Sequence, residues 1–436
     1  MKRILAAIDF FAFLLLGAFF LAALLSVFFT TSIFFGKKRR KPGAVNKFTF
    51  PVYDLISDKY DSMFEEALLG DFIYKDYYIY LDFNNPDDRY EEIGGRIFFW
   101  SVAAHPDNRI YRAGFRKINM ILTEINILVK SFKIILGSGI SAIKAHDPHL
   151  LGLNGLVLSR LFRVPFIIHL NSDFDMKYLG TGRVASPMLI SRGVERLLES
   201  FTIDRADIVM ADRKFYSNSK SLPKRSLSRY RAVGVRVDQT HYTDPVLRRD
   251  MKEALGAEGR KVLLYVGRLH PVKYPEDAIK AFKTVKANIG NAVLWIVGSG
   301  VLKEHLQGMA ISMGLKDSVF FLGSKKNHDL INIFSTADVL LAPHGGLTLV
   351  ESALASTPIV AYDFDWHSEF LEDGKMGYLV PFRDSEEMAR RAVNILSDEG
   401  LHARMSDYCR TVALERCSRY RSVENERKVY EELLRV

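Results

Sequence analysis

The stretch KVLLYVGRLHPVK, residues 261–273, runs from a short apolar segment into a glycine and a basic loop. Such a run is typical of a buried parallel strand that ends in a loop carrying polar groups. Similar apolar runs, each followed by a turn and an amphipathic stretch, are AVLWIV (292–297), SVFFL (318–322), DVLLA (338–342) and PIVAY (358–362). This alternation predicts βαβ units and a parallel sheet with helices on both faces.

The first half of the chain repeats the alternation less regularly. Strands are expected at 77–81, 96–101, 141–145, 165–170 and 206–211, with amphipathic helices near 115–136 and 189–202. The polar, basic stretch 213–229 has no periodicity, which favours a surface loop or an irregular helix. No clear strand lies in 236–260, so the linker between two α/β units is expected there.

Length and composition fit two globular domains with an appendage. The 436 residues exceed one ordinary core, and 48% hydrophobic with 25% charged residues is typical of a folded chain. The two cysteines, Cys409 and Cys417, form neither a zinc-binding spacing nor a disulfide framework, which favours a reducing compartment. The net charge of +9 is partly concentrated near the N-terminus, so it does not require a nucleic-acid partner.

The N-terminal segment predicts a membrane helix. Phe10 to Phe35 holds 26 residues without a charge, and a spanning helix needs about 20. The basic run Lys37 to Lys41 outweighs the cations on the other flank, so a single pass would leave the rest of the chain in the cytoplasm. The alternative is a re-entrant or in-plane helix hinged near Gly17.

Two strand ends carry groups suited to a phosphate ligand, because ligands of open α/β sheets bind beyond the carboxyl ends of the strands. Arg268 and Lys273 follow Gly267, and two cations there could clamp a diphosphate; an ordinary solvated loop is the alternative. Gly345 and Gly346 open a helix after strand 338–342, where free backbone N–H groups attract phosphate.

Three other features are less specific. Glu351, further along the helix that follows Gly346, could accept hydrogen bonds from ribose hydroxyls, although a glutamate there also suits the helix dipole. The VGSG turn, 297–300, is interpreted as structural. Asp363 and Asp365 have a D-x-D spacing that could hold a divalent cation, but DFD also occurs at 173–175, which lowers the value of either copy.

The order of these motifs resembles family 4 of the GT-B glycosyltransferases across 258–400, with weaker likeness over 130–245. VGRLHPVK resembles that family's GRL-x-x-x-K, and HSEFLEDGKMGYLVP resembles its segment ending in E-x-x-x-D-G-x-x-G-x-L-V-P. The resemblance implies two Rossmann-like domains facing a cleft. It also implies retaining transfer from a nucleotide-diphosphate sugar without a metal cofactor.

The same resemblance implies a role for each site residue. Arg268 and Lys273 would hold the donor diphosphate, and Glu351, the second glutamate of the family's E-x7-E motif, would hold the ribose. The turn and helix start at Gly346, Leu347, Thr348 and Leu349 would contact the donor phosphates.

The chain departs from the family pattern at three positions. Pro343 stands where the first glutamate of E-x7-E is expected, and the neighbouring His344 could take over its contacts to the sugar. A gapless match puts Asn171 where the family often has a cleft histidine, with His169 two residues earlier. Tyr274 follows the lysine where glycine is usual.

These observations give one expected organisation. Residues 1–44 would form the anchor and basic flank, 45–240 the acceptor domain, 241–410 the nucleotide-sugar domain, and 411–436 a helix packing back across the cleft. The expected function is sugar transfer at the cytoplasmic membrane face to a lipid-linked or glycan acceptor. The alternatives are a catalytically impaired relative that binds donor or partner, an enzyme that isomerises a nucleotide sugar, and a metal-dependent GT-A transferase using DFD.

Overall fold

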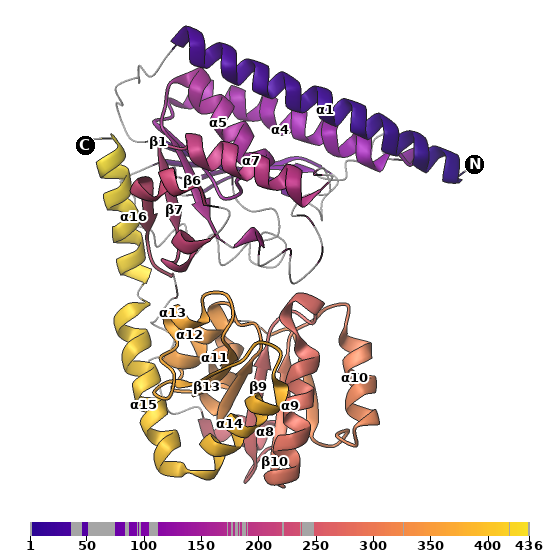
Figure 1. The fold of residues 1–436 in the computed structure, drawn as a ribbon, viewed down its shortest axis with the longest axis vertical. Helices are drawn as coiled ribbons and strands as arrows, with labels where there is room; N and C mark the ends of the chain where they lie inside the picture. Colours follow the sequence, from indigo (N-terminus) through magenta and orange to yellow (C-terminus); the bar gives the residue numbers. More distant parts are fainter. Residues whose placement is uncertain are drawn as a thin grey trace.

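The computed structural model describes residues 2–35, 46–50, 75–82, 87–93, 95, 97–103, 112–171, 173–175, 178, 182, 184, 189, 191–219, 222–235, 237, 248–325, 327–417 and 419–434. Two α/β lobes follow one another along the chain (Figure 1). The basic run 37–41 and residues 236 and 238–247 of the expected linker lie outside the described residues.

The N-terminal lobe is built on an eight-stranded sheet of order β3-β4-β2-β1-β5-β6-β7-β8. Each described pair is parallel except β3 with β4, which is antiparallel at the sheet edge. The strands are β1 (Asn46–Phe50), β2 (Lys75–Asp82), β3 (Arg89–Ile93), β4 (Ile97–Ala103), β5 (Ala142–Ala145), β6 (Phe166–Leu170), β7 (Ile208–Ala211) and β8 (Tyr230–Ala232). The central strands β5, β6 and β7 are buried along their whole length, which explains their continuous apolar runs.

Helices cover this sheet. The most buried of them, Leu150–Phe162, is apolar nearly all round. They are α4 (Arg116–Ser138), α5 (Leu150–Phe162), α7 (Arg192–Arg205) and the short 3₁₀ helices η2 (Phe215–Asn218) and η3 (Lys224–Arg229). Gly155 of α5 lies so close to β6 that a Cβ there would come within 2.6 Å of the Phe166 ring. Glycine at this position therefore permits close packing of helix on sheet.

The helix α1 (Lys2–Phe35) lies lengthwise on the N-terminal lobe against α4 and α5 (Figure 1). Its inner face buries Phe13, Phe20, Leu24 and Phe28 in the core of the lobe. Asp9 accepts hydrogen bonds at 3.1 Å from two backbone N–H groups in the first turn of α4. The helix continues without a break through Gly17, so the predicted hinge of the in-plane alternative is absent.

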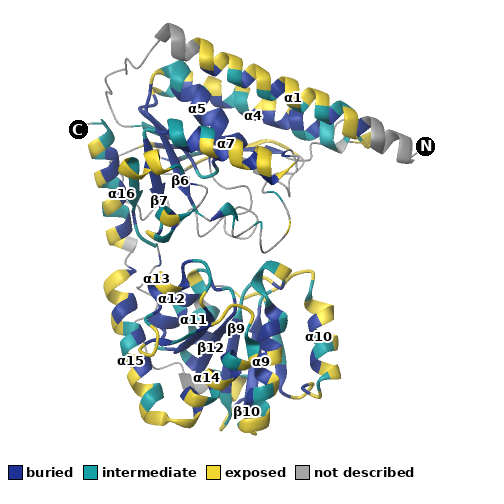
Figure 2. Cartoon of the chain, in the orientation of Figure 1, coloured by how far each residue is buried: buried dark blue, intermediate teal, exposed yellow. Residues whose placement is uncertain are grey.

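The C-terminal lobe has a wholly parallel six-stranded sheet of order β11-β10-β9-β12-β13-β14. Its strands are β9 (Lys261–Val266), β10 (Ala292–Val297), β11 (Val319–Gly323), β12 (Val339–Ala342), β13 (Ile359–Tyr362) and β14 (Gly377–Val380). Its helices are α8 (Arg248–Ala254), η5 (Pro271–Lys273), α9 (Pro275–Asn288), α10 (Lys303–Ser312), α11 (Asn327–Thr336), α12 (Leu347–Leu354), α13 (His367–Phe370) and α14 (Ser385–Ser397). Figure 2 shows the buried sheet between exposed helix faces.

The last two helices connect the lobes. α15 (Glu399–Arg416) packs on the C-terminal lobe, and α16 (Arg419–Leu434) returns to the N-terminal lobe (Figure 1). Val429 and Tyr430 join an apolar cluster with residues of β5, β6 and β7. Glu426 forms a buried ion pair with Lys144 of β5 at 2.8 Å. The chain therefore ends on the lobe in which it began.

The α/β prediction is confirmed, with each expected strand present. Four strands were not predicted from the sequence: β1, β3, β8 and β14. The stretch 213–229 contains the short helices η2 and η3, which is the irregular-helix form of the two expected alternatives. Arg213 and Tyr216 are buried beside the contact with the other lobe, and Ser226 is buried in η3, which packs on α7 and β7.

Candidate active site

The carboxyl ends of the two sheets meet between the lobes. Glu369 of α13, beyond β13, accepts hydrogen bonds from the backbone N–H groups of Lys214 and Phe215, beyond β7, at 2.8 and 2.6 Å. These contacts join the ends of one strand from each sheet. The groups that follow the other strands therefore face the same region, where open α/β sheets bind ligands.

The loop after β9 is fixed by backbone contacts with the VGSG turn. Gly267 N donates to Val297 O at 3.0 Å, and Leu269 N donates to Ser299 O at 2.8 Å. Gly298 has φ 139°, and a Cβ there would lie 2.0 Å from Gly267 O. Only glycine permits this approach. The turn is thus structural, as interpreted, and it supports the loop that carries Arg268.

Lys273 lies at the start of α12, and Arg268 is close enough to Lys273 to affect its charge. The Lys273 ammonium is 4.0 Å from the position of a Cβ on Gly346, the residue before α12. The Tyr265 hydroxyl lies 3.4 Å from the carbonyl oxygens of both Arg268 and Lys273 and so ties the loop together. Burial, with Arg268 and Arg213 nearby, lowers the pKa of Lys273 to about 8 although Asp365 opposes the shift. A lysine with a depressed pKa among cations is suited to an anionic ligand.

The turn before α12 is compact. A Cβ on Gly345 would come within 2.6 Å of Leu349 Cγ, so this position requires glycine. Gly346 N donates to Thr348 Oγ1 at 3.3 Å, and Leu347 is partly exposed at the helix start. Backbone N–H groups at this helix start and the Lys273 ammonium therefore share one small region. Glu351 lies one turn further along α12 and is half-buried.

His344 is held in place beside this turn. Its Nδ1 lies 2.6 Å from Val272 O, so Nδ1 must carry the proton that the carbonyl accepts. Its Nε2 is 3.6 Å from a carboxylate oxygen of Asp365. Only Nε2 thus remains for a ligand. The ring also packs edge-on against Phe364, with centroids 5.2 Å apart.

A second imidazole supports the turn from behind. His367 is fully buried, with Nδ1 2.7 Å from Tyr362 O and Nε2 3.3 Å from Gly345 O. Burial lowers the pKa of His367 to about 4, so the ring is neutral at pH 7. A neutral imidazole has one N–H, and it donates to Tyr362 O, the closer of the two carbonyl oxygens.

On the N-terminal lobe, Asn171 lies beside a histidine that was not singled out from the sequence. Its Nδ2 donates to His146 Nδ1 at 3.0 Å. The His146 ring stacks on His169 with centroids 4.7 Å apart, and His169 Nε2 lies 2.8 Å from a carboxylate oxygen of Asp212. An imidazole therefore stands next to the position where this chain has Asn171 in place of the family's cleft histidine. His146 directly follows β5, which is the signal that could have identified it.

Arg213 is the second residue missed from the sequence. Its Nη1 donates to the Tyr216 hydroxyl at 2.9 Å, and its guanidinium lies 3.7 Å from the ring centroid of Trp366 in the other lobe. The side chain is 8% exposed, and Nε has no hydrogen-bond partner among the described residues. No carboxylate pairs with Arg213 within the described part of the chain. A buried cation without an anion is costly, and a bound anion would relieve that cost.

A metal ion would need closely spaced carboxylate or imidazole ligands. Among the described residues, the only cluster with metal-ligand spacing is His149, Glu195 and Glu199 in the N-terminal lobe. Arg192 already pairs with both glutamates, which fills the position with a guanidinium. Burial opposes the charge on His149, but Asp147 and Glu199 raise its pKa to about 10. The cluster is thus a buried ion network.

The DFD alternative receives no support from this geometry. Asp363 and Asp365 do not form a metal-spaced group within the described residues, and Asp365 faces His344. In the other DFD segment, Asp175 pairs with Arg192 and Arg196. Asp365 and Asp175 therefore each have a nearby imidazole or cationic partner.

Comparison with known proteins agrees with the geometry. Residues 248–412 match the family model described as glycosyl transferases group 1. Alpha-D-kanosaminyltransferase of Streptomyces kanamyceticus is 24% identical over 58% of this chain and 66% of its own length. Matches to three similar relatives cover 62% to 66% of those proteins, so the chain spans just under two thirds of their length.

Two solved structures share the whole fold. Sucrose-phosphate synthase of Thermosynechococcus elongatus superposes with a TM-score of 0.71 at 19% identity, over 89% of this chain and 99% of that one. HepE of Anabaena in complex with UDP superposes with a TM-score of 0.66 at 16% identity, over 90% of this chain and 100% of that one. The chain therefore has the GT-B fold. Its C-terminal lobe carries the group 1 glycosyltransferase domain, as the resemblance implied.

Proposed function

We propose that the protein moves a sugar from a nucleotide-diphosphate donor to a lipid-linked or glycan acceptor, with retention of configuration. The observation that carries the proposal is the Lys273 ammonium beside Gly346 at the start of α12. Arg268 lies on the same loop, and Arg213 approaches from the other lobe. HepE, which has the same fold, was solved with UDP, a nucleotide diphosphate.

The residues have distinct roles in this proposal. Arg268, Lys273 and the N–H groups near Gly346 stabilise the negative charge that develops on the leaving diphosphate. Glu351 binds the ribose, and Gly267, Gly345, Leu347 and Thr348 shape the phosphate site. The leaving phosphate accepts the acceptor's proton, so the chain supplies no dedicated base. The proposed mechanism uses no metal cofactor.

His344 contacts the sugar through Nε2 in this proposal, and Asn171, beside His146, faces the reacting sugar of the donor. Nδ1 of His344 is already occupied by Val272 O. His344→Gln should therefore retain part of the donor affinity, whereas His344→Ala should lose it. Unchanged turnover in both variants would show that His344 does not contact the sugar.

The membrane part of the proposal rests on α1. The segment Asp9–Thr30 is long and apolar enough to cross a bilayer, and only 17% of its most apolar window is buried. The basic run 37–41 favours the cytoplasmic side for the catalytic lobes that follow α1. Attachment to the membrane would also bring these lobes close to an acceptor carried by lipid. A reporter fused after Val436 should be cytoplasmic, and a signal from the opposite side would contradict this orientation.

Donor binding and transfer test the proposal directly. The full chain in detergent is screened by thermal shift against nucleotide diphosphates and their sugars, because a bound ligand raises the melting temperature. Arg268→Ala and Lys273→Ala should each cost about 2 to 4 kcal/mol in kcat/KM, while Lys283→Ala, on the exposed face of α9, should not. Normal turnover in both site variants would refute the assignment.

A catalytically impaired relative is the second candidate, favoured by Pro343 in place of an expected glutamate. Such a protein would bind UDP or another nucleotide diphosphate normally. It would show neither transfer nor slow donor hydrolysis. Thermal stabilisation by the donor without any released sugar therefore separates the two candidates.

A further inference from the structure

The helix α4 has a mixed inner face and a largely apolar outer face. Ile121, Ile127 and Ile135 are buried in the core together with Asn119, Thr123 and Ser131, and the hydroxyls of Thr123 and Ser131 donate to carbonyls of the preceding turn at 2.9 and 2.6 Å. Besides the polar Asn126 and Lys133, the exposed face carries large apolar residues: Leu122, Ile125, Val129, Phe132 and Leu136, at 41%, 38%, 46%, 38% and 67% exposure. A helix that faces water has the opposite polarity.

The C-terminal lobe has ordinary amphipathic helices, so the apolar exposed face is a local feature of α4. On α14, Met388, Ala389 and Ala392 face the core, while Arg390 and Arg391 are exposed. The outer face of α4 therefore differs in kind from the water-facing surface of the same protein.

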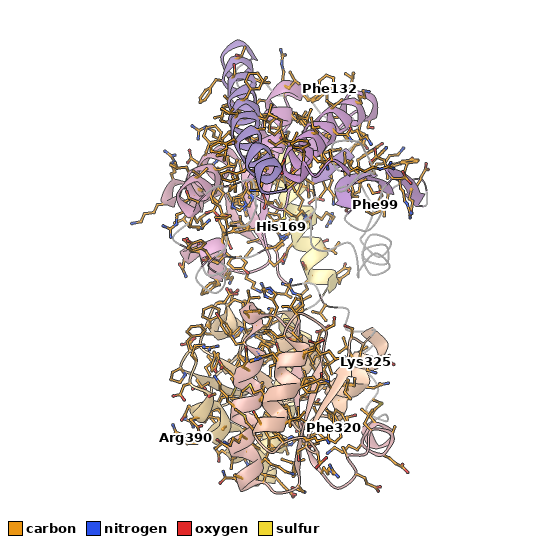
Figure 3. All side chains as sticks on the ribbon, turned by 90° about the vertical axis from the view of Figure 1, so that its right-hand side faces the viewer. Phe99, Phe132, His169, Phe320, Lys325 and Arg390 are labelled. Carbon is orange, nitrogen blue, oxygen red and sulfur yellow. The ribbon has the colours of Figure 1, made fainter. Side chains whose placement is uncertain are left out.

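The apolar face of α4 continues onto α1. Phe11, Leu15 and Phe19 follow one another at helical spacing on the outer side of α1, with 65%, 74% and 73% exposure. Gly17 of α1 lies against Ile121 of α4, and Asp9 caps the first turn of α4. The two helices together form the end of the lobe farthest from the other lobe, where Figure 3 labels Phe132.

We propose that the outer faces of α1 and α4 both enter one leaflet of a bilayer, so that the N-terminal lobe rests on the membrane through two in-plane helices. The proposal deepens the membrane attachment proposed above and requires no catalytic activity. It differs from a single-pass anchor because the Asp9 cap holds α1 along the lobe rather than away from it.

A bilayer is the occupant that the neighbouring residues favour. α1 has the length and composition of a membrane helix, and its exposed side is continuous with that of α4. The polar groups at the edge are cations: Lys133 is exposed beside Phe132, and Lys117 lies 4.2 Å from the ring centroid of Phe10. Lysines at such a boundary reach phosphate headgroups while their stems stay in the apolar layer.

Site-specific fluorescence in lipid vesicles tests the proposal with the full chain. Single cysteines are introduced as Phe19→Cys on α1, Val129→Cys on α4 and Val301→Cys on the C-terminal lobe, each at an exposed position. The native Cys409 and Cys417 are buried, and burial raises the pKa of both thiols, so they should not react with the label. Each cysteine carries an environment-sensitive dye, and the vesicles carry spin-labelled lipids with the quencher near the headgroup or near the chain end.

The proposal requires shallow quenching at both helices. The labels at positions 19 and 129 should shift to shorter wavelength and be quenched more strongly by the headgroup-proximal spin label, whereas the label at 301 should remain unchanged. Deep quenching at 19 with no lipid effect at 129 would establish a single span and overturn the proposal. A second result would also overturn the proposal: a label at 129 that is shielded without lipid, together with cross-linking of two chains through the unlabelled cysteine at 129. The exposed positions on α4 are spaced three and four residues apart, so they could also pack against a second copy of the helix.

A charge substitution gives an independent readout. The double variant Val129→Glu with Leu136→Glu should lose vesicle flotation, while Val301→Glu with Ile311→Glu should float like the parent. Thermal stabilisation by UDP is measured in both variants, so that failure to fold or to bind donor is seen separately. Unchanged flotation of a folded α4 variant would contradict the proposal even if sugar transfer is established.

Discussion

Tyr274 occupies a backbone position that favours glycine. Its φ is 50°, in the left-handed region, which costs about 1 to 2 kcal/mol for a residue with a side chain. The ring is held by Arg383, whose guanidinium lies 4.7 Å from its centroid, and by Phe382 at 5.5 Å. The same conformation ends η5 directly after Lys273. The departure from the family's glycine is therefore accommodated without moving the lysine.

The depressed pKa of Lys273 predicts opposite effects on stability and on binding. The pKa is about 8 in the folded protein and 10.5 in the reference state, so the charged form destabilises the fold below pH 8. This cost disappears as pH rises from 8 to 10.5. Lys273→Met should remove it and stabilise the ligand-free protein at pH 7 by about 1 to 2 kcal/mol, after allowance for partial exposure.

Two measurements check this prediction. Thermal unfolding without ligand should occur at higher temperature in Lys273→Met than in the parent. Calorimetric titration of the parent with UDP should show affinity falling as pH rises through 8, and the variant should lose that dependence. A variant that is less stable than the parent at pH 7 would show that Lys273 is not a desolvated cation.

Arg213 is predicted to bind the donor's diphosphate across the cleft. Arg213→Gln should weaken UDP binding by about 1.5 to 3 kcal/mol, the range for hydrogen bonds to charged groups, and Arg213→Lys should be intermediate. UMP, which lacks the second phosphate, is the control ligand. If UMP and UDP lose affinity equally, Arg213 only supports the lobe contact through Trp366.

Sequence reasoning placed Arg268 and Lys273 at the carboxyl end of a strand and did not single out Arg213. Arg268 and Lys273 follow a strand with a clear apolar pattern, so their place at the sheet edge could be inferred. Arg213 also follows a strand, but it begins a polar stretch without periodicity. Its burial depends on Trp366 from a segment more than 150 residues away, which no local pattern records.

At the scale of elements, the unpredicted strands are those whose identity depends on their neighbours. β1 (NKFTF) is polar in three of its five residues and β8 has only three residues, so neither has the composition of a buried strand. β1 is nevertheless central, between β2 and β5. α1 poses the converse problem, because an apolar helix has the same composition whether it crosses a bilayer or lies along a domain.

The Asp9 cap predicts how firmly α1 is attached. Asp9→Ala removes two acceptors from the first turn of α4 and should cost about 1 kcal/mol locally. Hydrogen exchange at the Lys117 and Ile118 amides should become faster, while exchange in β9 stays unchanged. Asp9→Asn, which keeps one acceptor, should lie between the two. Equal exchange in all three proteins would mean that the cap does not hold the helix.

For the whole molecule, Glu369 is predicted to favour the closed arrangement of the lobes. It accepts two backbone N–H groups of the other lobe, and Glu369→Ala should lose about 1 kcal/mol of closure. Small-angle scattering of the variant should give a larger radius of gyration without UDP, and added UDP should reverse the change. Glu369→Gln is the matched control, and identical scattering in parent and alanine variant would contradict the prediction.

The return of α16 to the first lobe has a consequence for synthesis on the ribosome. The partners of β5, β6 and β7 in the apolar cluster are Val429 and Tyr430, and Glu426 neutralises Lys144. These residues are synthesised after the whole second lobe, so the first lobe stays open on one side while the second is being made. A nascent chain arrested before residue 419 should therefore expose the β5 to β7 surface to chaperones, and release of the finished chain should end that exposure.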